Sequence, residues 1–160
     1  MIRKLICTIT LSVIGSAMSS FGQNEEQLQA VIMDTVLTNN ANAVVRLSEL
    51  VVEVNSVHEV RIKRKLVITV LNEKGRVVPN IYDYYDPGVK IKKQHAVVYN
   101  ALGSPIKKYK KNDFIDQSVS DGNSLVTDNR VSYIDYTPTK YPYTVLYESE
   151  LESNSSAFAP

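Results

Sequence analysis

Residues 60–70 read VRIKRKLVITV, and this stretch decides the fold. Apolar side chains alternate along it with basic or polar ones, so that Ile62, Leu66 and Ile68 share one face. A period of two is typical of a β-strand with one buried face. We therefore expect these three residues at the centre of the core, with Arg64 as the single charged residue on their face.

Similar alternation continues on both sides of this strand. In residues 45–54 the apolar face slips by one position between Leu47 and Leu50, which predicts a β-bulge near Ser48-Glu49. Gly75 ends a turn sequence and suits a left-handed backbone position. Further expected strands lie at residues 89–99, 106–109, 125–127, 131–136 and 143–151.

Many short alternating strands separated by turn residues predict an all-β protein made of antiparallel sheet. The expected architecture is an antiparallel β-sandwich with a short N-terminal helix or arm, and the alternative is a partly open β-barrel. Residues 41–160 would form the sandwich and residues 23–40 a linker or short helix, with Asp34 as its N-cap. Because the chain stops soon after the stretch at 143–151, we expect a truncated domain in which that strand is an open edge. The alternative is that residues 143–151 lie inside the sheet and that Pro160 is a true terminus.

The first 22 residues have the layout of a secretory signal peptide. Arg3 and Lys4 open the chain, an apolar run from Leu5 to Met18 follows, and small residues precede Gln23. The run is shorter than the roughly 20 residues of a membrane span. We therefore expect export to the periplasm or cell envelope, cleavage before Gln23, and no membrane span after cleavage.

Cleavage would remove the only cysteine, Cys7, and two basic residues, which leaves 16 basic residues against 17 acidic ones. The mature chain would then have no thiol, no disulfide and no thiolate metal ligand. A net charge near −1 argues against nucleic acid as a partner.

Catalytic and metal-binding patterns are weak. Only His58 and His95 could act as a catalytic base, and no nucleophile elbow accompanies either, so we expect no enzyme activity. His95 is expected on the core side of its strand. The loop with Asp113 and Asp116 has oxygen ligands of the kind calcium prefers, but turn-forming aspartates are the favoured interpretation. We expect no metal site and no cofactor.

Tyrosines supply the candidate binding residues. Three of them lie close together near residue 83, and two flank Pro142. Exposed tyrosines stack on sugars or hold peptides, whereas half-buried ones pack at sheet edges. The candidate binding residues are Tyr82, Tyr84, Tyr85, Tyr141 and Tyr143.

The order of several segments resembles a known family. These segments are NAVVRL at 42–47, VITVLNEKG at 67–75, YNALG at 99–103, KNDFID at 111–116, SLVTDNR at 124–130 and YPY at 141–143. They resemble the β-rich domain of unknown function that precedes transglutaminase-like domains in exported bacterial envelope proteins. The resemblance implies a domain without assigned activity, next to a partner domain with a Cys-His-Asp triad that nothing in this chain matches.

Two functions follow as expectations. The first is a non-catalytic exported module that binds or positions a partner domain, a peptide or a glycan in the cell envelope. The alternative is the N-terminal fragment of a transglutaminase-like, cysteine-protease-like enzyme whose catalytic domain lies downstream.

Overall fold

A computed structural model of the protein describes residues 28–77, 79, 81–119 and 128–156. The elements in chain order are α1 (Thr35–Thr38), β1 (Ala43–Ser56), β2 (Glu59–Val70), η2 (Glu73–Val77), β3 (Tyr82–Tyr85), β4 (Val89–Tyr99), β5 (Pro105–Lys110), η3 (Lys111–Asp113), β6 (Ile115–Ser118), β7 (Arg130–Tyr133) and β8 (Tyr143–Ser153). The predicted signal peptide and the expected strand at 125–127 lie outside the described residues.

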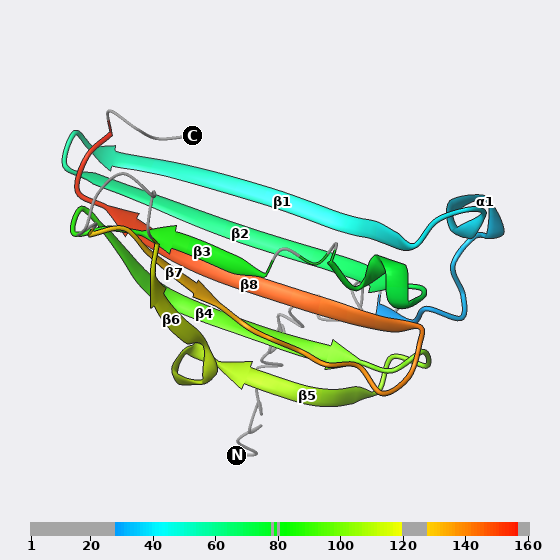
Figure 1. Cartoon of the computed structure of the whole chain (residues 1–160). Coiled ribbons are helices and arrows are strands. Elements are labelled where there is room, and N and C mark those ends of the chain that lie inside the picture. The colour runs from blue at the N-terminus through cyan, green and yellow to red at the C-terminus, as the bar shows by residue number, and fades with distance from the viewer. Residues whose placement is uncertain (1–27, 78, 80, 120–127, 157–160) are drawn as a thin grey trace, which may run out of the picture.

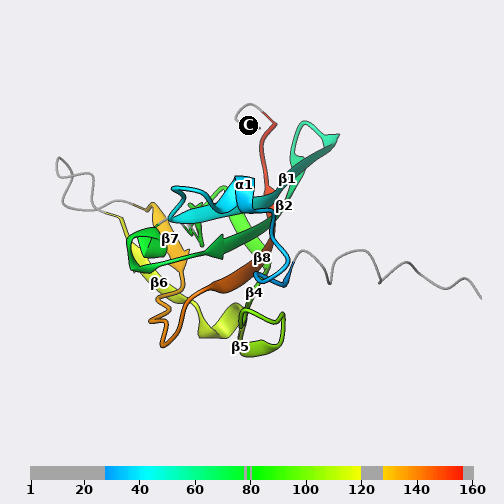
Figure 2. The ribbon, with the colours of Figure 1, turned by 90° about the vertical axis from the view of Figure 1, so that its right-hand side faces the viewer.

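The strands form two antiparallel sheets, which confirms the all-β prediction (Figure 1). The larger sheet has the order β1-β2-β8-β4-β5, and the smaller has the order β3-β7-β6. The larger sheet ends in two separate edge strands, β1 and β5, so it is not closed into a barrel. Figure 2 views the molecule along the strands and shows β6 and β7 set apart from the larger sheet.

The core fills the space between the two sheets. Leu66, Ile68 and Val70 from β2 contribute to it, as do Tyr143, Val145 and Tyr147 from β8 and Ala96 and Val98 from β4. Ile134 and Tyr136, which follow the smaller sheet, pack against this cluster. Leu66 and Ile68 are core residues as predicted, but Ile62 is only half-buried and lies outside the cluster.

β8 is the central strand of the larger sheet, so the expectation of an open edge at 143–151 is wrong. It pairs over its whole length with β2 on one side and with β4 on the other. Leu146 lies opposite Val67 and Val97 and is half-buried. The edge strands of the larger sheet are instead β1 and β5.

Bulges decide which residues face the core. The bulge predicted near Ser48-Glu49 lies earlier, at Arg46, between the pairs Val45–Ile68 and Leu47–Val67. A second irregularity, at Lys92 in β4, reverses the faces of the residues that follow it. Gln94 therefore points inward, and His95 lies on the outer face opposite Glu148, contrary to the sequence prediction.

One end of the outer face is also covered. Val67 and Thr69 lie on the outer face of β2, yet they are 2% and 0% exposed. Gln29 accepts a hydrogen bond from Arg46 Nη1 at 2.8 Å, and the Ala30 amide donates to the Ala101 carbonyl at 2.9 Å. These contacts tie the segment before α1 to β1 and to the β4–β5 turn, at opposite sides of the sheet.

The helix and the turns follow their local sequence. The Asp34 side chain accepts from the Val36 amide at 2.9 Å and caps α1, as predicted. Gly75 does not have the left-handed backbone that was predicted. The need for glycine at this position comes instead from the backbone of Asn42, which passes close to it. A Cβ there would lie 2.0 Å from the Asn42 carbonyl oxygen. Among the described residues, no helix has the length and apolar character needed to cross a membrane.

Candidate functional site

A groove runs between the start of β4 and the smaller sheet. Its volume is about 670 Å³, the largest of the cavities described. The β4 bulge and the end of β3 form two of its sides, and the η3 region forms another. The lining residues are Tyr85, Asp86, Pro87, Val89, Lys90, Ile91, Lys92, Gln94, Lys111, Asn112, Phe114, Asp116 and Ser132.

Tyr85 is the sequence-predicted tyrosine that lines this groove. Alternation along β3 puts Asp83 and Tyr85 on one face, and Tyr82 and Tyr84 on the other. The Tyr85 hydroxyl donates a hydrogen bond to Asp116 on β6. Arg130 on β7 donates from Nε to the Tyr85 hydroxyl oxygen at 3.0 Å and to Asp116 Oδ1 at 2.8 Å.

This triad of Tyr85, Asp116 and Arg130 has a defined charge state. The hydrogen bond from Tyr85, together with the charge of Arg130, holds the pKa of Asp116 below its ordinary value. Desolvation, followed by the Asp116 carboxylate, raises the pKa of Tyr85. At neutral pH the triad is therefore a neutral phenol between a carboxylate and a guanidinium, and its ring is fixed at the groove wall.

The floor of the groove leads into a buried polar cluster. Gln94 is 3% exposed and Ser132 is 7% exposed. Ser132 Oγ donates to Gln94 Oε1 at 2.7 Å, while Gln94 Nε2 donates to Asp83 Oδ2 at 3.1 Å and to the Tyr147 hydroxyl at 3.0 Å. Because each of these side chains has partners, they are held in one orientation at the groove floor.

Asp83 is the charged centre of that cluster. Tyr147 and Ser149 from β8 both donate hydrogen bonds to its carboxylate, and Arg64 Nη1 lies 3.8 Å from Oδ1. Burial raises the pKa of Asp83, against the opposing effect of these donors. Arg64 also donates to the Tyr82 carbonyl at 3.0 Å and lies 5.5 Å from the centre of the Tyr147 ring. The one charged residue on the apolar face of β2 thus has a buried partner.

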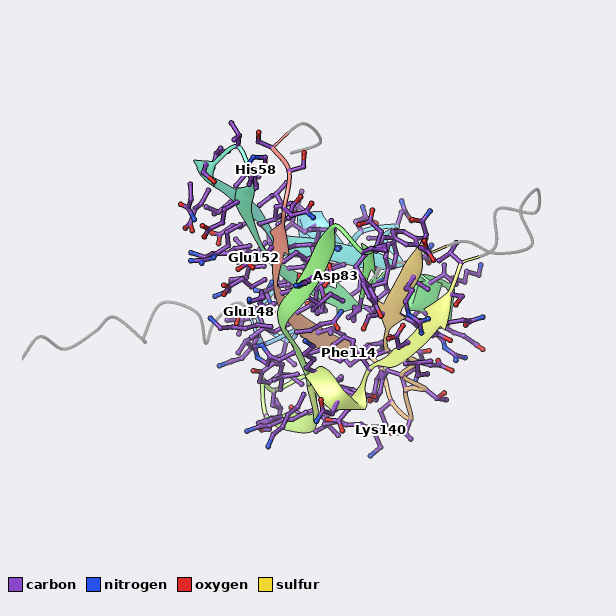
Figure 3. The ribbon with its side chains drawn as sticks, turned by 90° about the vertical axis from the view of Figure 1, so that its left-hand side faces the viewer. His58, Asp83, Phe114, Lys140, Glu148 and Glu152 are labelled. Carbon is purple, nitrogen blue, oxygen red and sulfur yellow. The ribbon has the colours of Figure 1, made fainter. Side chains whose placement is uncertain are left out.

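The opposite wall is cationic and aromatic. Lys111 at the start of η3 donates from Nζ to the Ile91 carbonyl, next to the β4 bulge. Phe114 is buried and packs against the Tyr147 ring, with ring centres 6.1 Å apart. Figure 3 shows Asp83 and Phe114 in this region, whereas His58 lies at the far tip of the β1–β2 hairpin. The groove thus combines ring faces with amide, ammonium and carboxylate groups.

The other predicted tyrosines do not line this groove. Tyr82 and Tyr84 pack edge to face on the outer side of β3, with ring centres 5.0 Å apart, and Tyr84 is exposed. Tyr141 and Tyr143 pack together at the start of β8, with ring centres 5.7 Å apart. Tyr143 is 2% exposed and belongs to the core, and burial raises its pKa to about 12. An exposed platform cannot include Tyr143.

The remaining candidates have structural partners. Asp113 Oδ2 accepts from the Lys110 amide at 2.7 Å and caps η3, in agreement with the turn-forming interpretation. Asp116 belongs to the triad with Tyr85. His95 Nδ1 lies 3.6 Å from Glu148 on the outer face. Within the described part of the chain, no three His, Cys, Asp or Glu side chains are grouped to hold a metal ion.

Sequence reasoning missed most of the groove floor. Gln94, Ser132 and Ser149 have the composition of a solvated strand face, and the Lys92 bulge that turns Gln94 inward has no sequence signal. One signal was available, because Arg64 on an apolar face requires a buried acceptor or anion nearby.

Comparisons with known proteins agree with this fold. Residues 56–160 match the family described as "Domain of Unknown Function with solved-structure structure (DUF3857)". A crystal structure titled as that of a "putative protease" from Parabacteroides distasonis superimposes with a TM-score of 0.53 at 9% sequence identity. That match covers 72% of this chain but 24% of the other, so the chain spans about a quarter of that protein's length. No curated protein shows significant similarity.

Proposed function

This chain belongs to the family DUF3857, and from that premise we propose that it is a non-catalytic binding module of the cell envelope. The ligand we propose is an uncharged oligosaccharide, held in the groove between β3 and β4. The observation that carries the proposal is the position of Tyr85, whose ring is fixed at the groove wall by Asp116 and Arg130.

The chemistry of the groove suits a sugar. A pyranose ring presents an apolar face, which packs on an aromatic ring, and a rim of hydroxyl groups, which need donors and acceptors. The Tyr85 ring supplies the first surface. Asn112, Lys90 and Lys92 supply amide and ammonium groups around it. The buried cluster around Gln94 holds the floor of the groove in one arrangement before a ligand binds, which lowers the entropy cost of binding.

The absence of catalytic activity is part of the proposal. Cys7 is the only thiol in the sequence and would leave with the signal peptide. His95 has Glu148 as its ion-pair partner on the outer face. Export is proposed from the signal-peptide pattern, and N-terminal sequencing of periplasmic protein should return Gln23 as the first residue.

Titration calorimetry with N-acetylglucosamine oligosaccharides tests the groove. We expect binding by the chain from Gln23 onward, loss of binding in Tyr85→Ala, and retention in Tyr84→Ala, which removes an exposed ring from the same strand. Tyr85→Phe keeps the ring but removes its hydrogen bonds to Asp116 and Arg130, so it should weaken binding less than Tyr85→Ala does. Equal weakening by Tyr84→Ala and Tyr85→Ala, or no binding by the parent chain, would contradict the proposal.

A second candidate is that the module positions a catalytic domain in a longer polypeptide. Its support is that the structural match occupies 24% of a protein described as a "putative protease". The resemblance to domains that precede transglutaminase-like domains points the same way. Sequencing the gene past codon 160 tests it, and a downstream domain with a Cys-His-Asp triad is the expected result.

A further inference from the structure

The two edges of the larger sheet differ in how well they are protected against further strand pairing. The edge strand β5 begins at Pro105 and carries three lysines in its six residues. Proline and lysine are the residues that natural proteins use to block edge pairing. The edge strand β1 has 14 residues with no proline and no lysine, and its two irregularities, at Arg46 and Asn55, lie near its ends and leave residues 47–54 regular. No other strand in the described part of the chain pairs with its free side.

The inner face of β1 is apolar and uncovered. Val45, Leu50 and Val54 lie opposite the core face of β2 but are 54%, 56% and 60% exposed. The smaller sheet explains this, because β3 lies over β2 and β8 and does not reach β1 (Figure 1). A strand added to this edge would bury these side chains and pair the free backbone groups of β1.

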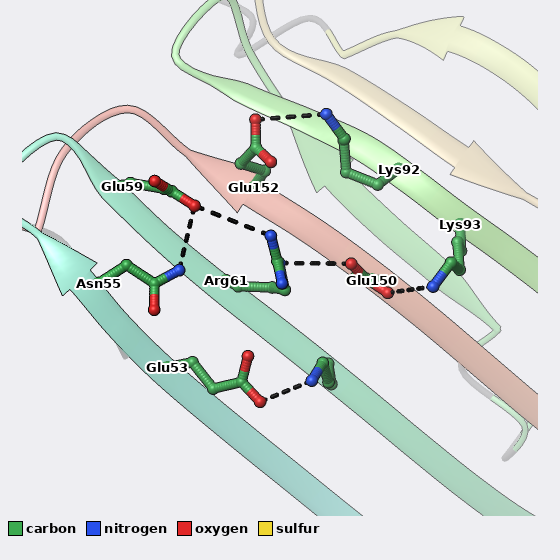
Figure 4. A network of polar contacts seen from close by, with 9 residues as sticks. Glu53, Asn55, Glu59, Arg61, Lys92, Lys93, Glu150 and Glu152 are labelled. Atoms are coloured by element: carbon green, nitrogen blue, oxygen red, sulfur yellow. Dashed lines mark hydrogen bonds and ion pairs between the residues drawn. The ribbon is translucent and has the colours of Figure 1, made fainter.

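The outer face shows which charges an added strand should have. Acidic and basic strands alternate across it, with Glu53 on β1, Arg61 on β2, Glu150 and Glu152 on β8, and Lys92 and Lys93 on β4 (Figure 4). Acids of β8 have basic partners on both sides. Glu150 contacts Arg61 at 3.4 Å and Lys93 at 2.7 Å, while Glu148 contacts Lys65 at 3.1 Å and His95 at 3.6 Å.

The acids of β1 have a basic neighbour on one side only. Glu53 pairs with Lys63 on β2. Glu49 is exposed and has no ion pair within the described residues. Continuing the alternation would place a basic strand next to β1, where its cations would face Glu49 and Glu53.

We propose that the free edge of β1 binds an extended protein segment in which basic residues alternate with apolar ones. The segment adds a sixth strand to the larger sheet. Its apolar side chains cover Val45, Leu50 and Val54, and its basic side chains lie beside Glu49 and Glu53. This surface is separate from the groove, so a negative result for one proposal leaves the other unaffected.

A second copy of this chain is a poorer occupant than a basic segment. Pairing β1 with β1 would bring the acidic rows of two outer faces together, and like charges on neighbouring strands are destabilising. The charge pattern therefore favours a basic partner over self-association. A test can compare basic with acidic segments at this edge.

The test uses short synthetic peptides and the chain from Gln23 onward. One fluorescently labelled peptide alternates lysine with valine, a second alternates glutamate with valine, and a third has the lysines and valines in two blocks. We expect the first to bind, with binding that weakens as salt is added, and the other two to bind at least about 5-fold more weakly. Hydrogen exchange should slow specifically in residues 47–54.

Matched variants locate the site. Glu49→Lys should weaken binding of the lysine–valine peptide about 3- to 10-fold. Glu73→Lys makes the same charge change in η2 and should leave binding unchanged, as should Ile106→Asn on the β5 edge. Thermal melts verify that all three variants fold. Equal weakening by Glu73→Lys, exchange protection elsewhere than β1, or dimerisation through β1 in light scattering would overturn the proposal.

Discussion

The Tyr147 hydroxyl donates a hydrogen bond to the Asp83 carboxylate and so joins the central strand of the larger sheet to β3 of the smaller sheet. Tyr147 is fully buried and Asp83 is 5% exposed. Ser132 of the smaller sheet is also buried and polar, and it donates a hydrogen bond to Gln94. The contact between Tyr147 and Asp83, with Gln94 and Ser149 around it, fixes where the smaller sheet sits and therefore where the groove opens.

Tyr147→Phe should lower the free energy of unfolding by about 1–3 kcal/mol, because it removes a buried donor from an anion that keeps its burial. Tyr133→Phe is the control, since that hydroxyl makes an exposed hydrogen bond to Gln117. It should change stability by less than about 0.5 kcal/mol. Urea denaturation of both variants measures the difference, and equal losses would contradict the role assigned to Tyr147.

Asp83 predicts a particular pH dependence of stability. Because burial raises its folded-state pKa above the ordinary 3.8, the folded protein binds this proton more tightly than the unfolded chain does. The resulting stability is fully present below pH 3.8 and is lost as pH rises through the folded-state pKa. Relative to Asp83→Asn, the parent chain should therefore become less stable as pH rises above about 4. Denaturation of both proteins over a series of pH values measures this difference. If the parent chain instead became more stable than Asp83→Asn as pH rises, the attraction of Arg64 for the carboxylate would outweigh the effect of burial on the pKa of Asp83.

The position of the core predicts a contrast within β2. Ile68 is 4% exposed and belongs to the core cluster, so Ile68→Ala should cost about 2–5 kcal/mol. Ile62 lies on the same face but is half-buried, and Ile62→Ala should cost clearly less. Chemical denaturation compares the two. A larger loss for Ile62→Ala would place the core centre toward the β1–β2 hairpin.

Gly75 should not tolerate alanine. A Cβ at this position would lie 2.0 Å from the Asn42 carbonyl oxygen, which accepts a hydrogen bond from the Leu71 amide. The backbone must then shift, at a cost of about 1–3 kcal/mol. Gly88→Ala is the control, because its Cβ would meet the side-chain oxygens of Asn154 and Asp86 at 3.1 and 3.2 Å, and these can move. Thermal melts that rank Gly88→Ala as the more damaging change would count against this account.

The sequence was sufficient to predict most strands of the larger sheet, but it was insufficient to predict which face of each strand is buried. Alternation located β1, β2, β4 and β8 because a period of two survives locally in each strand. It failed after residue 92, since one bulged residue reverses every later side chain and left His95 on the outer face. Strand order was also beyond it, because nothing local in residues 143–153 distinguishes a central strand from an edge.

The candidate site divides in the same way. The sequence identified Tyr85 as a candidate binding residue, but it placed Tyr143 in the same group. Tyr143 lies more than fifty residues later in the chain and is buried in the core. Gln94 and Asp83 look like surface residues in the sequence. They become a site because β4, β3 and β8 converge, and convergence of strands distant in sequence is a property of topology.

The central position of β8 has a consequence for the order of folding. Within the described residues β8 follows the other seven strands, yet β2 and β4 have it as their shared neighbour. The β1–β2 and β4–β5 hairpins can therefore form as soon as they are synthesised, but they remain unjoined until residues 143–153 are available. The larger sheet is therefore assembled by a strand that lies more than forty residues after β4 in the chain, and the two hairpins depend on that distant segment to become one sheet.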